Sequence, residues 1–173
     1  MQTLRARPAL MILLVLLALG LLTGVAYAIG RSLGYIPGVG LVEQGAEVFV
    51  VNRTHEHAVT LARQAKAKSL KHEVFAKQRF DVLINSTPCG MTGFKQTLPI
   101  AENELNAGLV FDMVYSPLET PLLKLAKSRG IPGVSGLEMF VQQGARQFEI
   151  WTGKPAPEAE MMRVVDHALR KRG

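Results

Sequence analysis

The sequence is poor in cysteine, in aromatic residues and in negative charge. A single cysteine, Cys89, excludes a small scaffold held by internal disulfides, and we expect it to be a packing residue rather than a nucleophile. One tryptophan, three tyrosines and seven phenylalanines offer little for stacking on bases. Lysine and arginine exceed aspartate and glutamate by 20 to 14, but the excess is concentrated between residues 53 and 79. We therefore expect one modest domain with no nucleic-acid partner.

Charge is absent from residues 8–30, which are almost entirely apolar. As a helix this stretch would be ~35 Å long, enough to cross a bilayer core, so a transmembrane anchor is one interpretation. Arg5 and Arg7 before the stretch, with the small residues of 26–28 near its end, also fit a signal peptide. The length favours the anchor, and on that basis we expect a hydrophobic N-terminal helix within residues 1–33.

A third interpretation places the same stretch inside an α/β domain. Residues 11–19 would then be a buried parallel strand, 20–24 a turn and 25–33 a helix. The next segment, residues 34–45, is rich in glycine and proline and predicts a linker rather than a helix. We expect the folded domain that follows this linker to occupy residues 46–173.

Beyond the linker, short apolar runs alternate with amphipathic stretches, as in successive β-α units of a parallel sheet. Strands are predicted at residues 47–51, 81–84, 109–113 and 132–134. Helices are predicted at residues 55–68, 121–128, 136–152 and 156–171. In the third of these helices the apolar residues share one face, and we expect Phe148 and Trp151 to lie in the core. A complete first β-α unit is not predicted, because no strand is followed by a Gly-x-Gly-x-x-Gly loop and a helix.

Ligands of an open parallel sheet bind beyond the carboxyl ends of its strands, where this sequence has polar residues. Asn52, Arg53 and Thr54 follow the first predicted strand. A dinucleotide site selective for NAD would have an acidic residue here, whereas an arginine favours a 2′-phosphate, which it can bind with two hydrogen bonds. The alternative is a solvated arginine at a helix start, where the helix dipole disfavours a cation.

The two following strands also end in polar loops. Residues 85–93 carry small hydroxyl groups and a glycine that suit close passage of a ribose or an amide, although alone they would be only a capped loop. After the third strand, Tyr115 either lies near the mouth of the crevice or holds its hydroxyl group in water. The sequence predicts no metal site.

Four segments together resemble the C-terminal, NADP-binding domain of the shikimate dehydrogenase family. They lie between about residues 45 and 157 and read GAEVFVVNRT, DVLINSTPCGM, VFDMVYSPLETPLLKLAKSRG and SGLEMFVQQGARQFEIWTG. The resemblance implies a Rossmann-like α/β fold, a parallel sheet flanked by helices, with NADP as its cofactor. It implies that the adenosine phosphate of NADP is bound by Asn52, Arg53 and Thr54. It further implies cofactor contacts from Thr87, Met113 and Gly136, and a shikimate side formed by Tyr115 and Gln143.

The chain departs from the family in its N-terminal part. Family members carry a substrate-binding domain with a catalytic lysine and aspartate before the nucleotide domain, whereas only 44 residues precede Gly45. The family's glycine-rich loop is also missing, and His57 replaces a second arginine that some members have. We therefore expect no catalytic residue in this chain, and a truncated domain of an NADP-dependent enzyme that interconverts 3-dehydroshikimate and shikimate.

The resemblance also bears on location and partners. The cofactor chemistry predicts a cytoplasmic protein that binds NADP(H), and shikimate or 3-dehydroshikimate only where a substrate domain is supplied. The alternative function is a non-catalytic nucleotide-binding or interaction module, anchored in a membrane through residues 8–30.

Overall fold

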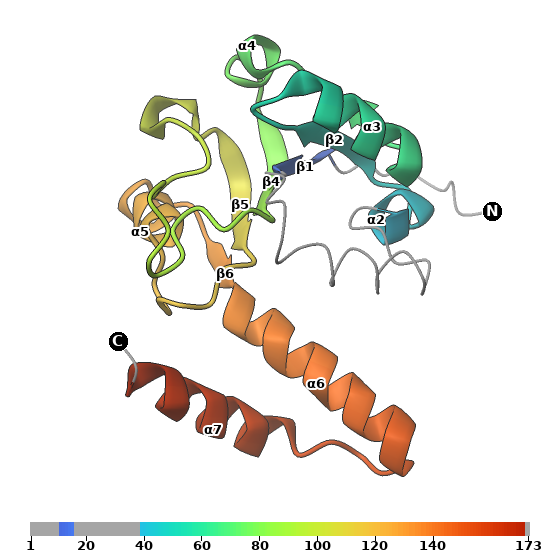
Figure 1. The fold of residues 1–173 in the computed structure, drawn as a ribbon, viewed down its shortest axis with the longest axis vertical. Helices are drawn as coiled ribbons and strands as arrows, with labels where there is room; N and C mark the ends of the chain where they lie inside the picture. The colour runs from blue at the N-terminus through green and yellow to red at the C-terminus, as the bar shows by residue number, and fades with distance from the viewer. Residues whose placement is uncertain (1–10, 16–38, 172–173) are drawn as a thin grey trace, which may run out of the picture.

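The computed structural model describes residues 11–15 and 39–171, which form a single parallel β-sheet with helices packed against it (Figure 1). The strand order is β3-β2-β1-β4-β5-β6, and every neighbouring pair is parallel. The strands are β1 (Met11–Val15), β2 (Glu47–Val51), β3 (Lys68–Ser69), β4 (Phe80–Asn85), β5 (Ala107–Asp112) and β6 (Gly133–Ser135). The predicted α/β class with a parallel sheet is confirmed.

The four predicted helices begin and end close to where the sequence places them, and two further short helices, α2 (Val39–Glu43) and α4 (His72–Phe75), were not predicted. The four predicted helices are α3 (His55–Ala65), α5 (Pro121–Ser128), α6 (Gly136–Thr152) and α7 (Glu158–Arg170), and a 3₁₀ turn lies at Glu102–Glu104. Helix α5 starts where the Thr120 hydroxyl accepts a hydrogen bond from the Leu123 amide and proline occupies the first turn. Helix α3 ends at Ala65, three residues earlier than predicted, because Lys66 adopts a left-handed conformation.

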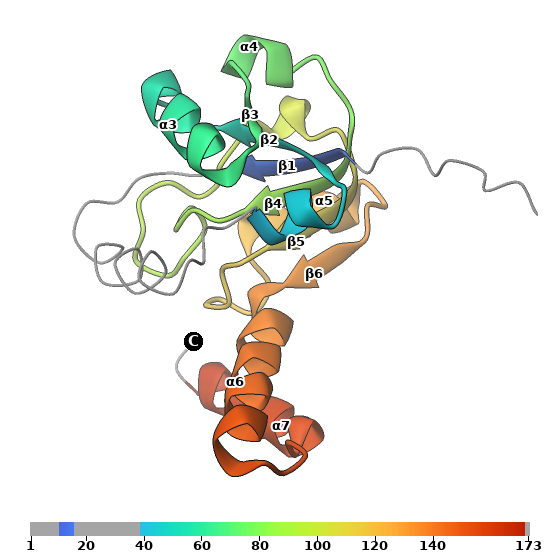
Figure 2. The same ribbon diagram turned by 90° about the vertical axis from the view of Figure 1, so that its right-hand side faces the viewer.

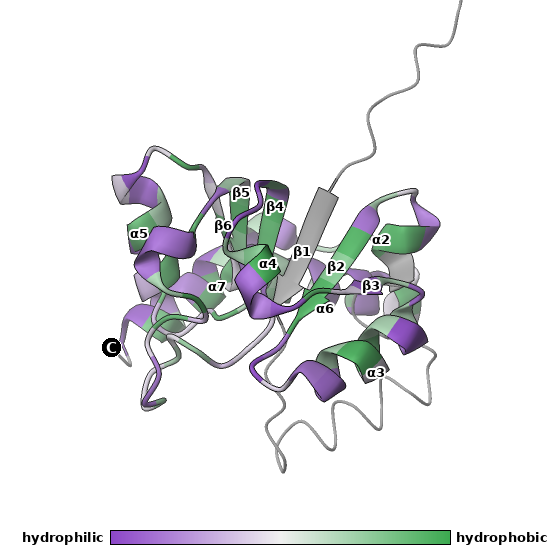
Figure 3. Ribbon diagram, turned by 90° about the horizontal axis from the view of Figure 1, so that it is seen from above, coloured by the Kyte–Doolittle hydropathy of each residue, from purple (hydrophilic) through white to green (hydrophobic). Residues whose placement is uncertain are grey.

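Both faces of the sheet are covered, so its strands alternate between two cores. From β2, Val48 and Val50 face the side of α2 and α3, while Phe49 and Val51 face the side of α4 and α5. The larger core, on the second side, contains Phe75, Phe80, Leu83, Ile100, Leu105, Val110, Leu122 and Ala126. Figure 2 shows helices on opposite sides of the sheet, and Figure 3 shows hydrophobic colour on β2 and β4 between them. Strands buried on both faces need continuous apolar runs, as EVFVV and FDVLIN nearly provide.

The N-terminal prediction is corrected at residues 11–15. These residues form β1, which pairs with β2 on one side and β4 on the other, and is not part of a hydrophobic helix. This agrees, over residues 11–15, with the third interpretation of the stretch, a buried parallel strand. The sequence left the choice open because an uncharged apolar run suits a central parallel strand as well as a membrane helix.

The rest of the hydrophobic helix predicted within residues 1–33 lies outside the described residues. The turn at 20–24 and the helix at 25–33, which belong to the third interpretation, lie outside them as well. Within the described part of the chain, no helix has both the length and the apolar character needed to cross a membrane.

The predicted linker at residues 34–45 is corrected as well. Residues Val39–Glu43 form helix α2, and Leu41 and Val42 pack against Val48 and Ile84 on one face of the sheet. Gly45, with φ of 85°, then turns the chain into β2. The glycine signal therefore marked the turn after a short helix.

Helices α6 and α7 form a hairpin that extends away from the sheet (Figures 1 and 2). Val141 and Ala145 are buried in α6, but Trp151 near its end is 79% exposed and Ile150 is 67% exposed. The prediction that Trp151 lies in the core is wrong, and Phe148 is only half-buried. The helical periodicity was right, but α6 runs past the edge of the sheet, so nothing described covers its far end.

Candidate functional site

The parallel sheet gathers the predicted site residues at one edge. Because all strands run the same way, the carboxyl ends of β2, β4, β5 and β6 lie along the same edge of the sheet. The eight predicted site residues are Asn52, Arg53, Thr54, Thr87, Met113, Tyr115, Gly136 and Gln143. Seven of them lie within three residues of a strand end, and Gln143 lies in the second turn of α6.

The end of β2 carries a buried polar group that lacks a partner. Asn52 is 5% exposed, and its Oδ1 accepts a hydrogen bond from the Thr54 amide over 2.9 Å. Its Nδ2 is buried and donates to no atom of the described residues. A buried donor without an acceptor is destabilising, typically by about 1–3 kcal/mol, so such groups often mark a ligand site. Arg53 and Thr54 beside it are exposed at the start of α3.

The ends of β4 and β5 are joined by a network of buried side chains. Asp112, the last residue of β5, accepts hydrogen bonds from Asn85 Nδ2 over 2.8 Å, from the Val114 amide over 3.1 Å and from Thr120 Oγ1 over 2.6 Å. Asn85 Nδ2 also donates to the Cys89 carbonyl oxygen. Burial raises the pKa of the Asp112 carboxyl, against the opposing effect of the hydrogen bonds from Thr120, Val114 and Asn85.

Thr87 belongs to this network. Its amide and its hydroxyl both donate to Asn85 Oδ1, over 3.0 and 2.6 Å, and its hydroxyl oxygen accepts from the Cys89 amide. The Thr87 hydroxyl proton is thus already used to hold the loop after β4. The Cys89 side chain is buried, and burial raises the pKa of its thiol, while the charge of Arg53 acts in the opposite sense.

The backbone just after β5 contacts both the end of β4 and the start of α6. The Met113 amide donates to the Asn85 carbonyl oxygen over 2.9 Å. A Cβ atom on Gly136 would lie 2.2 Å from the Met113 carbonyl oxygen, so only glycine allows this approach of α6. The family resemblance implied that Gly136 lies beside the cofactor, and the structure adds this packing requirement.

Tyr115 contacts Phe140, and Gln143 follows Phe140 by one turn of α6. The Tyr115 ring, 39% exposed, packs on the Phe140 ring with centroids 5.2 Å apart. Gln143 follows Phe140 by three residues on α6, so the two are neighbours on the helix surface, and Gln143 is exposed. Both predicted substrate-side residues are therefore accessible at the start of α6.

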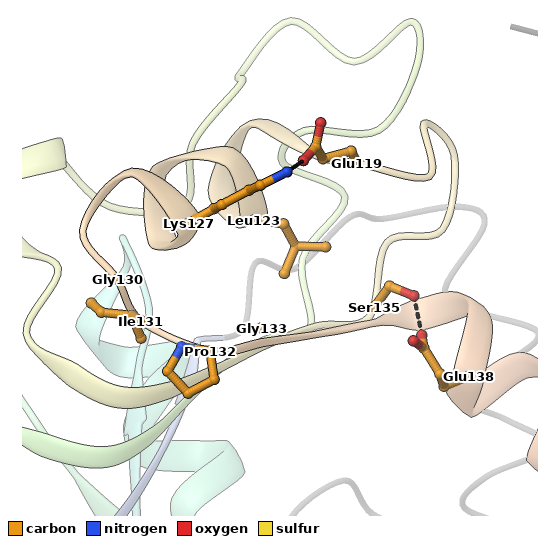
Figure 4. A pocket seen from close by; sticks show the side chains of 9 residues that line it. All are labelled: Glu119, Leu123, Lys127, Gly130, Ile131, Pro132, Gly133, Ser135 and Glu138. Atoms are coloured by element: carbon orange, nitrogen blue, oxygen red, sulfur yellow. Dashed lines mark hydrogen bonds and ion pairs between the residues drawn. The ribbon is translucent and has the colours of Figure 1, made fainter.

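A separate hollow lies between α5, β6 and the start of α6 (Figure 4). Its volume is about 470 Å³, and it is lined by Glu119, Leu123, Lys127, Gly130, Ile131, Pro132, Gly133, Ser135 and Glu138. Its polar groups already pair with each other: Lys127 with Glu119 over 3.2 Å, and the Ser135 hydroxyl with Glu138. None of the eight predicted residues lines this hollow. Across residues 11–15 and 39–171, no group of histidine, cysteine and acidic side chains could hold a metal ion.

Sequence reasoning missed Asn85, Asp112 and Thr120 as a connected group. A signal was present, because the two otherwise apolar strands FDVLIN and AGLVFD each end in a polar residue. Adjacent parallel strands that end in an amide and a carboxylate place these two groups within reach of each other. The register confirms this, since Asn85 is paired with Asp112.

The strand order and the polar carboxyl edge define the class of fold, a doubly wound α/β domain of the Rossmann type. Comparisons with known proteins narrow this class. The family model for the shikimate 5′-dehydrogenase C-terminal domain matches residues 136–165. The chain belongs to the shikimate dehydrogenase family and corresponds to its C-terminal, NADP-binding region.

Individual relatives support this assignment over most of the chain. The NADP(+) shikimate dehydrogenase of Archaeoglobus fulgidus is 40% identical over 150 residues, 79% of this chain and 54% of the relative. That of Methanosarcina acetivorans is 44% identical over 140 residues, 75% of this chain and 50% of the relative. The crystal structure of the Thermus thermophilus enzyme with NADP(H) and shikimate matches with a TM-score of 0.71 and 29% identity, over 92% of this chain and 55% of that one. The chain thus spans about half the length of the relatives that it matches.

Proposed function

We propose that this chain binds NADP(H) at the carboxyl edge of its sheet and acts as the nucleotide-binding half of a shikimate dehydrogenase. The observation that carries the proposal is the buried Asn52 Nδ2, which has no acceptor among the described residues and lies beside the exposed Arg53 side chain. The neutral Asn52 donor fits the ribose of NADP, and the Arg53 cation at the helix start fits the 2′-phosphate. Neither side chain carries a negative charge that would repel the phosphate. The names of the relatives support the same cofactor.

The predicted site residues would contact different parts of NADP along the carboxyl edge of the sheet. Asn52, Arg53 and Thr54 would hold the adenosine phosphate, with the arginine giving two charge-assisted hydrogen bonds. Thr87, Met113 and Gly136 would shape the middle of the crevice, where backbone groups of three strand ends come together. Bound NADPH would supply a hydride to the ketone of 3-dehydroshikimate.

Tyr115 and Gln143 would orient the substrate on the far side of the crevice. Both are exposed near Phe140, and neither has a described partner that would act as a base. In this proposal a substrate-binding domain, from another polypeptide or another part of the protein, provides the proton transfer. The reaction of the whole enzyme therefore depends on that second domain.

Cofactor preference tests the proposal directly. We expect the chain to bind NADP more tightly than NAD in titration calorimetry, and Arg53→Ala to weaken NADP binding by about 1.5–3 kcal/mol while leaving NAD binding nearly unchanged. Arg63→Ala is the matched control, because Arg63 is also an exposed arginine but lies in the last turn of α3, whereas Arg53 precedes the first turn. Equal affinity of the unmodified chain for the two nucleotides would refute the role of Arg53.

A further inference from the structure

Asp112 is a fully buried carboxylate that the proposed function does not use. Its exposed fraction is 0%, so no ligand in the crevice can touch it without a rearrangement of the fold. Among the described residues no lysine or arginine pairs with it, and its charge is met by three hydrogen-bond donors. A buried charge without a counter-ion is costly, so the arrangement calls for a reason.

Each of the three donors belongs to a different segment of the site. Asn85 leads to the loop after β4, where its Oδ1 holds the amide and hydroxyl of Thr87. Val114 directly precedes Tyr115 in the loop after β5. Thr120 begins α5, where its hydroxyl also accepts from the Leu123 amide. One carboxylate therefore fixes both crevice loops and the helix that follows them.

The same loops also meet through the backbone further out. The Thr92 amide donates to the Ser116 carbonyl oxygen over 2.8 Å, and the Met113 amide donates to the Asn85 carbonyl oxygen. The loop after β4 and the loop after β5 are thus joined by two backbone hydrogen bonds and by the buried side-chain bond between Asn85 and Asp112. A shift of Asp112 would move Thr87 and Met113 relative to each other.

We propose that Asp112 is a positioning residue for nucleotide binding: it ties the loop that carries Thr87 to the loop that carries Met113 and Tyr115, so that NADP affinity depends on a side chain that does not touch NADP. The inference rests on the proposed function. A purely packing role would be served as well by a neutral side chain, yet the fold keeps an acid here although burial raises its pKa.

The test compares variants of the full chain that break or keep one bond to Asp112. Thr120→Val removes the hydroxyl with little change of shape, whereas Thr120→Ser keeps it; Asp112→Asn keeps the shape of Asp112 and removes its charge. Val110→Ala is the stability control, because Val110 is buried in the same strand but lies outside the network. NADP affinity is measured by calorimetry well below the melting temperature, and loop order by amide hydrogen exchange at Cys89 and Val114 without ligand.

We expect Thr120→Val and Asp112→Asn to weaken NADP binding about tenfold, which corresponds to about 1.4 kcal/mol. Exchange at Cys89 and Val114 should accelerate in both variants, while Thr120→Ser and Val110→Ala retain the affinity of the unmodified chain. Unchanged NADP affinity in Thr120→Val and Asp112→Asn, or an equal loss in Val110→Ala, would overturn the positioning role. Failure of the unmodified chain to bind NADP would instead overturn the proposed function and this inference together.

Discussion

At the residue scale, the buried Asp112 carboxyl makes stability depend on pH. Burial raises the pKa of Asp112 in the folded state, so folding favours its protonated form. Its contribution to stability is fully present below the ordinary pKa of 3.8 and is lost as the pH rises through the raised folded value. We therefore expect the free energy of unfolding of the unmodified chain, relative to that of Asp112→Asn, to fall as the pH rises from about 4 towards 7. Urea unfolding at several pH values measures this difference.

Asp166 provides a control of opposite sign. It is a half-buried residue of α7, and its pKa is lowered by the hydrogen bond from Arg170. Any contribution from Asp166 is present above its ordinary pKa and lost as the pH falls, so Asp166→Asn should give a small trend in the other direction. A stability difference for Asp112→Asn that did not change with pH would contradict the raised pKa.

Two large aromatic residues should differ sharply in what they contribute to stability. Phe75 is buried in the larger core, against Phe80, whereas Trp151 lies largely in solvent at the end of α6. We expect Phe75→Ala to lower the free energy of unfolding by about 3–5 kcal/mol. Trp151→Ala should change it by no more than about 0.5 kcal/mol, because little surface is buried. Chemical unfolding followed by far-ultraviolet circular dichroism checks both; a large loss at Trp151 would mean that the end of α6 is packed after all.

At the element scale, the two glycines of α6 should respond oppositely to alanine. At Gly136 the added methyl group would collide with the Met113 carbonyl oxygen. This oxygen is a backbone atom, so it cannot move aside as the end of a flexible side chain could. At Gly144 the added methyl group has no atom within 4 Å apart from the neighbouring backbone of its own helix. We expect Gly144→Ala to stabilise the domain by about 0.5–1 kcal/mol through helix propensity, and Gly136→Ala to destabilise it.

Melting temperatures of the two alanine variants decide this prediction. Gly136→Ala should also weaken NADP binding if α6 is forced away from Met113, whereas Gly144→Ala should not. A stable Gly136→Ala variant with unchanged affinity would show that the start of α6 has room that the structure denies it.

The elements also show how far sequence alone could lead. Strand β2 and helix α5 were predicted to the residue, since EVFVV is flanked by turn residues and Thr120-Pro121 is a strong helix start. Strand β1 was one of three open interpretations, because its burial between β2 and β4 depends on partners far along the chain. Trp151 was misplaced for a similar reason, since periodicity identifies an apolar face but not what covers it.

The candidate site shows the same division. The positions of Asn52, Arg53 and Thr54 after a strand followed from local patterns, and the structure places them there. The Asp112 network could not be assigned, because it needs the register of β4 against β5, which local sequence does not fix. Gly136 was expected beside a ligand, yet its contact with Met113 appears only once β5 and α6 are placed together.

At the scale of the whole molecule, we expect the chain to bind nucleotide without catalysing turnover. Hydride transfer needs the substrate held against the nicotinamide, and positioning alone supplies about 7–11 kcal/mol of barrier reduction. The purified chain should show no measurable shikimate-dependent reduction of NADP in an absorbance assay. Activity should return when the substrate-binding half of a relative is added, and that regained activity should fall in Gln143→Ala.

A robust rate for the chain alone, abolished by Tyr115→Phe, would contradict this expectation. It would require a proton donor within this chain, and Tyr115 is an exposed ionisable group in contact with Phe140. The nucleotide-binding result would stand in that case, because the Arg53 experiment does not depend on turnover.

The position of the only tryptophan, at the end of the α6–α7 hairpin, has a consequence for spectroscopy. An indole that is 79% exposed in the folded chain already emits much as it would in water, and acrylamide can reach it. Its emission should therefore change little while the β-sheet melts, even though the backbone signal in circular dichroism collapses. Fluorescence unfolding curves of this chain would report on the tip of one hairpin and would be insensitive to unfolding of the core that contains Phe75 and Phe80.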